Sequence, residues 1–127
     1  MKRKILEGFI LISKVLVVDD DIMFCNAMKY HLLQREYNVD ICISHDELQN
    51  KDIEEFDLIL LDMRLKDAEG LDILQSILEV NPAKKIIIVS SYLDDKSILK
   101  INELGAYKWI HKSSRLFEEL DLIMKQI

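Results

Sequence analysis

The chain has 127 residues, half of them hydrophobic, so we expect one domain with a single sizeable core and no room for a second. Its 17 lysines and arginines stand against 23 aspartates and glutamates, which leaves a formal net charge of −6. Because the positive charges are not clustered, this balance excludes a protein that holds nucleic acid by its phosphate backbone.

The first predicted segment is a short N-terminal extension, residues 1–13, ahead of a domain that spans residues 14–127. Basic residues at positions 2–4, followed by apolar ones, are similar to the start of a signal peptide. We reject a signal peptide because Glu7 and Gly8 interrupt the apolar part and no small-residue cleavage site follows. No stretch reaches the ~18 uncharged residues that a membrane helix requires, so we expect no membrane insertion. The conformation of the extension is left open.

Five strands are predicted, over residues 15–18, 39–43, 58–61, 86–89 and 107–111. The first, third and fourth are continuous apolar runs, which are typical of strands covered on both faces, so we expect them in the centre of a sheet. The second alternates between apolar and polar residues and the fifth is mixed. Both patterns indicate half-exposed strands at the edges of the sheet.

Helical patterns fill the gaps between the predicted strands. Apolar residues recur three or four positions apart, which places them on one side of each helix. The stripes are Phe24, Ala27, Met28 and His31; Leu71, Leu74, Ile77 and Leu78; and Leu116, Leu120, Ile123, Met124 and Ile127.

Residues that begin and end helices agree with this division of the chain. Residues 44–47 match a capping box before a short second helix. Asn81 and the proline after it end the third helix, Asp94 or Asp95 caps the fourth, and Gly105 closes it. Right-handed crossovers between five strand–helix units then predict an α/β fold. It is an open five-stranded parallel sheet in the flavodoxin-like order 2-1-3-4-5, with helices on both faces.

Carboxylates follow two of the central strands. Asp19, Asp20 and Asp21 come directly after the first strand, and Asp62 comes after the third. Since ligands of such sheets bind beyond the carboxyl ends of the strands, where the first and third strands meet, several negative oxygens should share one small space. Such a cluster needs a cation, and Mg2+ prefers carboxylates, waters and phosphate oxygens. The feature therefore predicts a magnesium site and phosphoryl chemistry.

Two more residues extend this constellation to neighbouring strands. Ser90 ends the fourth strand and Lys112 follows the fifth, so a hydroxyl and an ammonium reach the same rim. Both suit the oxygens of a phosphoryl group. We therefore expect Asp62 to attack a donor phosphate in line, with Mg2+ on Asp19 and Asp20 and with Lys112 neutralising the growing charge.

At this point the chain resembles a known family, the CheY-like receiver domains of bacterial two-component response regulators. The resemblance covers residues 14–127 and rests on four motifs that are specific only in combination. They are Val17-Val18-Asp19-Asp20, the run from Phe56 to Asp62 with Gly70 eight residues later, Val89-Ser90-Ser91, and Gly105-Ala106 followed by Trp109 and Lys112.

The resemblance implies a role for each residue of the site. Asp62 is the phosphoacceptor, which takes phosphate from the phosphohistidine of a kinase, and Lys112 contacts the phosphate. Mg2+ is bound by Asp20 directly, by Asp19 through water, by Asp62, and by the backbone carbonyl of Arg64. The protein is then a switch with its own phosphorylation and dephosphorylation chemistry rather than a dedicated enzyme.

The resemblance also implies how the signal leaves the site. Ser90 moves toward the phosphate, the aromatic side chain of Trp109 swings inward, and the face made by the fourth helix, last strand and last helix changes shape. The expected partners are a sensor histidine kinase or phosphotransfer protein, a downstream protein target or output domain, and a second copy of the chain after phosphorylation. Direct nucleic-acid binding is not expected.

Two positions depart from the family pattern. Lys66 and Ser113 stand where the family usually has proline, the second often after a cis bond. A non-proline cis bond costs about 2.5–4 kcal/mol, so the isomer of the bond before Ser113 is left open. Arg64 and Tyr92 occupy positions that tune phosphate lifetime in the family.

Several alternatives stay open beside this interpretation. Asp19 and Asp20 would also serve as caps of the helix that begins near Ile22. The chain would also suit a small phosphatase of the haloacid-dehalogenase type, with Asp19 as nucleophile and Asp21 as the second carboxylate. A third alternative is a pseudo-receiver that binds partners and is never phosphorylated.

The cysteines and histidines lack the spacing of a binding site. Cys25 and Cys42 show no pairing or metal pattern, so we expect reduced, structural thiols and a cytoplasmic protein. His31, His45 and His111 show no ligand spacing, and we expect none of them to bind metal or carry phosphate.

Overall fold

A computed structural model describes residues 5–6, 9–10 and 12–127 of the chain. Its main body is a five-stranded parallel sheet in the order β4-β3-β5-β6-β7, which confirms the predicted order 2-1-3-4-5. The strands are β3 (Lys14–Val18), β4 (Asn38–Cys42), β5 (Leu58–Leu61), β6 (Lys85–Ser90) and β7 (Lys108–His111).

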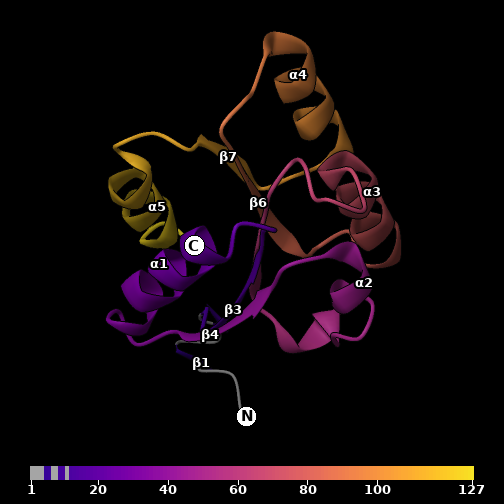
Figure 1. The fold of residues 1–127 in the computed structure, drawn as a ribbon. Coiled ribbons are helices and arrows are strands. Elements are labelled where there is room, and N and C mark those ends of the chain that lie inside the picture. The colour runs from indigo at the N-terminus through magenta and orange to yellow at the C-terminus, as the bar shows by residue number, and fades with distance from the viewer. Residues whose placement is uncertain (1–4, 7–8, 11) are drawn as a thin grey trace.

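Helices cover both faces of this sheet, as Figure 1 shows. One face carries α1 and α5, and the other carries α2, α3 and α4. The flavodoxin-like α/β architecture is thereby confirmed. The helices are α1 (Ile22–Leu33), α2 (His45–Leu48), α3 (Gly70–Val80), α4 (Asp95–Leu104) and α5 (Leu116–Met124), with a single 3-10 turn, η1 (Ile53–Glu55), before β5.

The three central strands are buried along almost their whole length because successive side chains enter two different cores. In β3, Leu16 and Val18 belong to the core under α2, α3 and α4, whereas Val15 and Val17 belong to the core under α1 and α5. This arrangement explains the continuous apolar runs. In the edge strand β7 only Ile110 is buried.

The predicted helix ends are confirmed at four places, one of them Asn81, which directly follows the last residue of α3. The Ser44 hydroxyl accepts a hydrogen bond from the Glu47 amide (3.0 Å) at the start of α2. Asp94 accepts one from the Ser97 amide (2.7 Å) at the start of α4, and Gly105 ends that helix with a left-handed φ of 98°. One predicted stripe is partly wrong. Ala27 of α1 is exposed, because Cys25, Met28 and Leu32 face the sheet instead.

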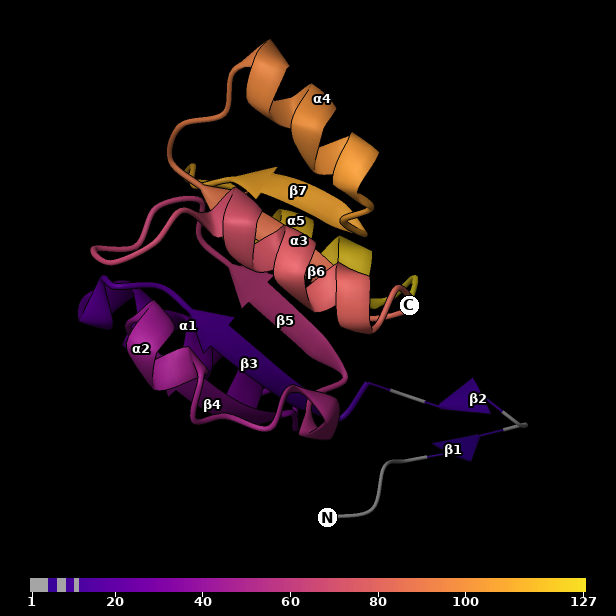
Figure 2. The ribbon, with the colours of Figure 1, turned by 90° about the vertical axis from the view of Figure 1, so that its right-hand side faces the viewer.

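An antiparallel pair of two-residue strands, β1 (Ile5–Leu6) and β2 (Phe9–Ile10), precedes the sheet and stands apart from it in Figure 2. The predicted extension, residues 1–13, lies partly outside the described residues, and its boundary with the domain stays a prediction. In the described part of the chain, no helix has the length and apolar character needed to cross a membrane.

Candidate functional site

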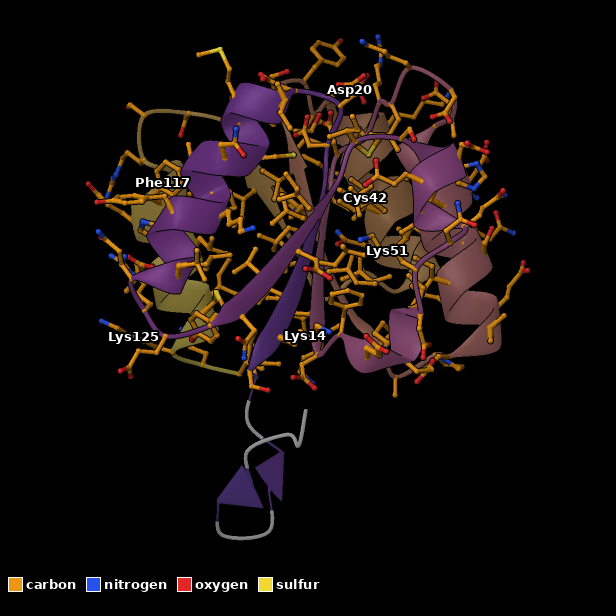
Figure 3. All side chains as sticks on the ribbon, turned by 60° about the horizontal axis from the view of Figure 1, so that its bottom comes forward. Lys14, Asp20, Cys42, Lys51, Phe117 and Lys125 are labelled. Atoms are coloured by element: carbon orange, nitrogen blue, oxygen red, sulfur yellow. The ribbon has the colours of Figure 1, made fainter. Side chains whose placement is uncertain are left out.

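The parallel register of β3 and β5 brings two carboxylates to one rim. Val18 pairs with Leu61, so the residues that follow them, Asp19 and Asp62, leave the sheet side by side. Ligand oxygens of Asp19, Asp20 and Asp62 all lie within 4.8 Å of one another. Figure 3 places Asp20 at this carboxyl end of the sheet, opposite Lys14 at the start of β3. Three carboxylates this close match the oxygen donors that Mg2+ takes.

The helix-cap alternative for Asp19 and Asp20 is wrong, because the neighbouring carboxylate of Asp21 does that work. Asp21 Oδ1 accepts hydrogen bonds from the amides of Met23 (3.1 Å) and Phe24 (3.2 Å) at the start of α1. Asp19 Oδ1 instead accepts the amide of Asp21 (2.9 Å), which fixes the orientation of the Asp19 carboxylate. Neither Asp19 nor Asp20 is therefore the N-cap of α1.

Lys112 places its ammonium among these carboxylates. Its Nζ lies 2.7 Å from Asp19 Oδ2 and 3.9 Å from Asp62 Oδ2. The same Nζ lies 4.3 Å from the centre of the Phe24 ring, close enough for a cation–π interaction. None of the described peptide bonds is cis, so the bond between Lys112 and Ser113, left open by the sequence, is trans.

The Asp62 carboxyl is hard to ionise while the cluster holds no metal. Burial raises its pKa, and the negative charge of Asp19 raises it further, against the opposing effect of Lys112. Together they raise the pKa of Asp62 from 3.8 to about 6. Its side chain is only 12% exposed, so water solvates the anion poorly. A bound cation would remove this penalty.

Ser90 reaches the same rim, but its hydroxyl is turned toward its own loop. Ser90 Oγ donates a hydrogen bond to the Tyr92 carbonyl (3.1 Å) and accepts one from the Tyr92 amide (3.3 Å). The Ser90 carbonyl accepts the Lys112 amide (2.7 Å), which joins the ends of β6 and β7. Trp109 lies away from the carboxylates on β7, with 39% of its surface exposed.

Gly70, which stands out in the sequence only for its spacing from Asp62, lets the loop after Asp62 pack closely against the start of α3. A Cβ at Gly70 would collide with the backbone carbonyl of Asp62, and the Gly70 amide donates a hydrogen bond to the Met63 carbonyl (2.6 Å). Arg64 lies exposed in this loop and pairs with Glu69 in an isolated β-bridge. Its carbonyl as a metal ligand stays a prediction.

The sequence does not reveal two residues that contact the site or its surroundings. Phe24 belongs to an apolar stripe, and no local pattern indicates that its ring contacts Lys112. Asp67 lies in a loop with no recognisable motif, and its carboxylate accepts hydrogen bonds from the first two amides of α2.

The cysteines are free and buried, as expected, and burial raises the pKa of the Cys25 thiol to about 12. His31 pairs with Asp121 (2.8 Å), a carboxylate that is not part of the acidic cluster.

Comparison with known proteins identifies the same architecture elsewhere. Residues 15–123 match the family model described as the response regulator receiver domain. The chain is 32% identical over 111 residues to the transcriptional regulatory protein ZraR of Salmonella typhimurium, an alignment that covers 84% of this chain and 25% of that protein. The chain therefore spans about a quarter of the length of this curated relative.

Solved structures give matching results. A CheY-like receiver domain protein from Methanospirillum hungatei is 29% identical, with a TM-score of 0.81, and the match covers 91% of this chain and 93% of that one. The response regulator protein TrrA from Thermotoga maritima, solved in complex with Mg(2+)-BeF, is 27% identical, with a TM-score of 0.80 and coverage of 90% and 97%.

Proposed function

This chain belongs to the response regulator receiver domain family, and from that membership we propose that it is a phosphorylation-dependent switch of a two-component system. It accepts phosphate on Asp62 from a sensor histidine kinase or a phosphotransfer protein. The observation that carries the proposal is the ammonium of Lys112, seated between Asp19 and Asp62 within a cluster of three carboxylates. This cluster pairs a nucleophile with cation ligands and a fixed positive charge.

The proposed step is an in-line displacement at phosphorus. An Asp62 carboxylate oxygen forms the new bond to phosphorus, while the bond to the donor breaks and its electron pair leaves with the donor. Lys112 stays near the rim and pairs with the charge on the transferred oxygens. Mg2+ held by Asp19, Asp20, Asp62 and the Arg64 carbonyl would supply the positive charge that lets an anionic phosphate approach these carboxylates.

The proposed output runs through the face formed by α4, β7 and α5. The Ser90 hydroxyl breaks its hydrogen bonds to Tyr92 and binds the phosphoryl group, and Trp109 turns inward beneath the changed loop. The partner that recognises the changed face is a downstream protein, an attached output domain, or a second copy of the chain. A cytoplasmic location, with reduced cysteines, belongs to the same proposal.

The phosphatase alternative gains no support from the site. It needs Asp21 as a second carboxylate facing the substrate, yet Asp21 caps α1. Asp19, its proposed nucleophile, is paired with Lys112 and the Asp21 amide.

Incubation of the full chain with acetyl phosphate and Mg2+ tests the proposed function. We expect intact-mass spectrometry to show the addition of one phosphoryl group, and we expect Asp62→Asn to abolish it. Asp52→Asn is the matched control, because Asp52 is an exposed carboxylate before η1, at the opposite end of β5, and asparagine keeps its capping role. Labelling that persists in Asp62→Asn contradicts the proposal, as does failure of the wild-type chain to be labelled. The second result would favour the pseudo-receiver.

A further inference from the structure

The carboxylate of Asp67 joins the loop between β5 and α3 to α2 by hydrogen bonds. Asp67 Oδ1 accepts the amide of His45 (2.9 Å), and Asp67 Oδ2 accepts the amide of Asp46 (3.0 Å). These are the first two residues of α2, and the first amides of a helix have no partner inside it. Asp67 therefore supplies, from a distant loop, two caps that a helix usually finds in its own sequence.

The two hydrogen bonds are charge-assisted and lie on the surface. Asp67 is exposed, and the donated backbone hydrogen bonds lower the pKa of its carboxyl from the usual value. The carboxylate is therefore ionised at neutral pH, and hydrogen bonds to an ionised acceptor are stronger than neutral ones. Since Asp67 fills no core space, its replacement leaves the packing of the domain intact.

The loop that carries Asp67 begins directly after Asp62 of the acidic cluster. Its base is closed by the Gly70 amide on the Met63 carbonyl, and its tip by the Leu65 amide on the Ala68 carbonyl (3.0 Å). Leu65 is buried in the core, so the loop is held on both sides of Arg64. Asp67 and the backbone directly after Asp62 therefore belong to one hydrogen-bonded loop.

On the other side, α2 follows the edge strand that supports Asp19. The Cys42 carbonyl at the end of β4 accepts the Asp19 amide (3.0 Å). A continuous path of hydrogen bonds and chain segments therefore joins Asp19 to Asp62. It runs through the end of β4 and the start of α2, and then through Asp67 and its loop. Figure 2 shows the loop and α2 at the same end of the sheet.

We propose that Asp67 is a positioning residue for the acidic cluster, and that its bond to the start of α2 couples cation binding at the cluster to the order of α2. The inference rests on the proposed function, because it assigns a second consequence to loading the same site. Coupling between two sites is reciprocal, so a cation that fixes the loop must also strengthen the bond to α2. The start of α2 then becomes a second part of the surface, besides the α4–β7–α5 face, whose order changes when the acidic cluster binds a cation.

The test compares Asp67→Ala with Asp94→Ala in the full chain. Asp94 is the matched control, because it is also an exposed carboxylate that caps a helix, but it caps its own helix α4. We expect Asp67→Ala to weaken Mg2+ binding about 10-fold in a titration without phosphodonor, within the range for groups that orient metal ligands. Asp67→Asn should recover part of the loss, since its amide oxygen still accepts a hydrogen bond. Equal Mg2+ affinity in Asp67→Ala and Asp94→Ala overturns the positioning role.

Hydrogen exchange of the His45 and Asp46 amides gives a readout that does not depend on phosphorylation. We expect Mg2+ to slow their exchange in the wild-type chain and in Asp94→Ala but not in Asp67→Ala. Unchanged exchange in the wild-type chain at saturating Mg2+ overturns the coupling. If acetyl phosphate fails to label Asp62 while these Mg2+ effects are seen, the proposed function fails and the coupling stands.

Discussion

At the level of single residues, the three clustered carboxylates put stability and function in opposition. Like charges within 4.8 Å repel one another when no cation is bound, and only Lys112 offsets them among the described contacts. A residue kept for function at the expense of stability is a common finding at such sites.

We therefore predict that Asp20→Asn weakens Mg2+ binding by about 10- to 100-fold, the effect typical of a disturbed metal site. Thermal stability without metal should be equal to or higher than that of the wild-type chain, because one repelling charge is gone. A Mg2+ titration and a melting curve in chelator measure the two effects. A variant that loses stability yet binds Mg2+ normally would make Asp20 a structural residue.

Gly70 gives a second prediction at this scale. In Gly70→Ala the new Cβ meets the backbone of Asp62 and Met63, so the phosphoacceptor loop must shift. We expect a loss of about 1–3 kcal/mol in the free energy of unfolding, as for other overpacked sites, together with weaker Mg2+ binding. Urea unfolding and a Mg2+ titration measure both.

Gly105→Ala is the control for that variant. Gly105 has a left-handed φ of 98°, and a Cβ there meets only Leu78 Cδ1 at 3.6 Å. The substitution should cost stability through backbone strain but leave Mg2+ affinity unchanged. If both alanine variants bind Mg2+ like the wild-type chain, Gly70 does not shape the site.

At the level of secondary-structure elements, the end of β6 and the strand β7 form the proposed path from the site to the surface. Ile88 and Ser90 of β6 pair with Trp109 and His111 of β7. The Ser90 hydroxyl must leave both of its hydrogen bonds to Tyr92 before it can reach a phosphoryl group. Trp109 is the only tryptophan of the chain, so its fluorescence reports on this strand alone.

We predict that phosphorylation, or a phosphoryl mimic with Mg2+, shifts the emission or quenching of Trp109. In Ser90→Ala the labelling of Asp62 should persist while the fluorescence change is lost, because the hydroxyl that draws the loop inward is missing. Steady-state emission at full phosphorylation, verified by intact mass, is the measurement. Unchanged emission at that point contradicts this switch mechanism and leaves the phosphorylation chemistry intact.

The elements themselves were predictable because their residues carry local signals. Strands β3, β5 and β6 are buried on both faces and therefore read as unbroken apolar runs, and Asp94 and Gly105 mark the two ends of α4. The rotation of α1 was not predictable at Ala27, since that helix carries apolar residues on its exposed side as well, among them Met23 and Tyr30.

The candidate site was predictable as a set of strand ends but not in its contacts. Asp19, Asp20 and Asp21 have the same side chain, so the sequence does not show that Asp21 caps α1 whereas Asp19 faces Lys112 from the far end of the chain. The ring of Phe24 on Lys112 likewise joins residues from opposite ends of the chain, and no spacing in the sequence reveals it.

At the level of the whole molecule, the raised pKa of Asp62 links folding to pH. The folded chain binds this proton more tightly than the unfolded chain, since its pKa is about 6 instead of 3.8. Stability from this group is therefore present below the lower value and is lost as the pH rises through the higher one. The full shift corresponds to at most about 3 kcal/mol, and screening by water at this rim reduces it to about 1–2 kcal/mol.

We predict that without metal the wild-type chain loses about 1–2 kcal/mol relative to Asp62→Asn between about pH 4 and pH 7. Urea unfolding of both proteins in chelator across this range measures the difference. Adding Mg2+ at neutral pH should reduce this difference in the free energy of unfolding. Only the wild-type chain retains all three carboxylates, so bound Mg2+ stabilises it more than Asp62→Asn. Parallel stability curves without metal would show that Asp62 titrates normally.

The position of the phosphoryl group tests the central claim most directly. The full chain is incubated with acetyl phosphate and Mg2+, reduced with borohydride, which converts an aspartyl phosphate to homoserine, and then mapped by peptide mass spectrometry. We predict conversion of Asp62 alone, dependent on Mg2+. Conversion of Asp19, or of no aspartate in a chain that has gained a phosphoryl group, contradicts the account.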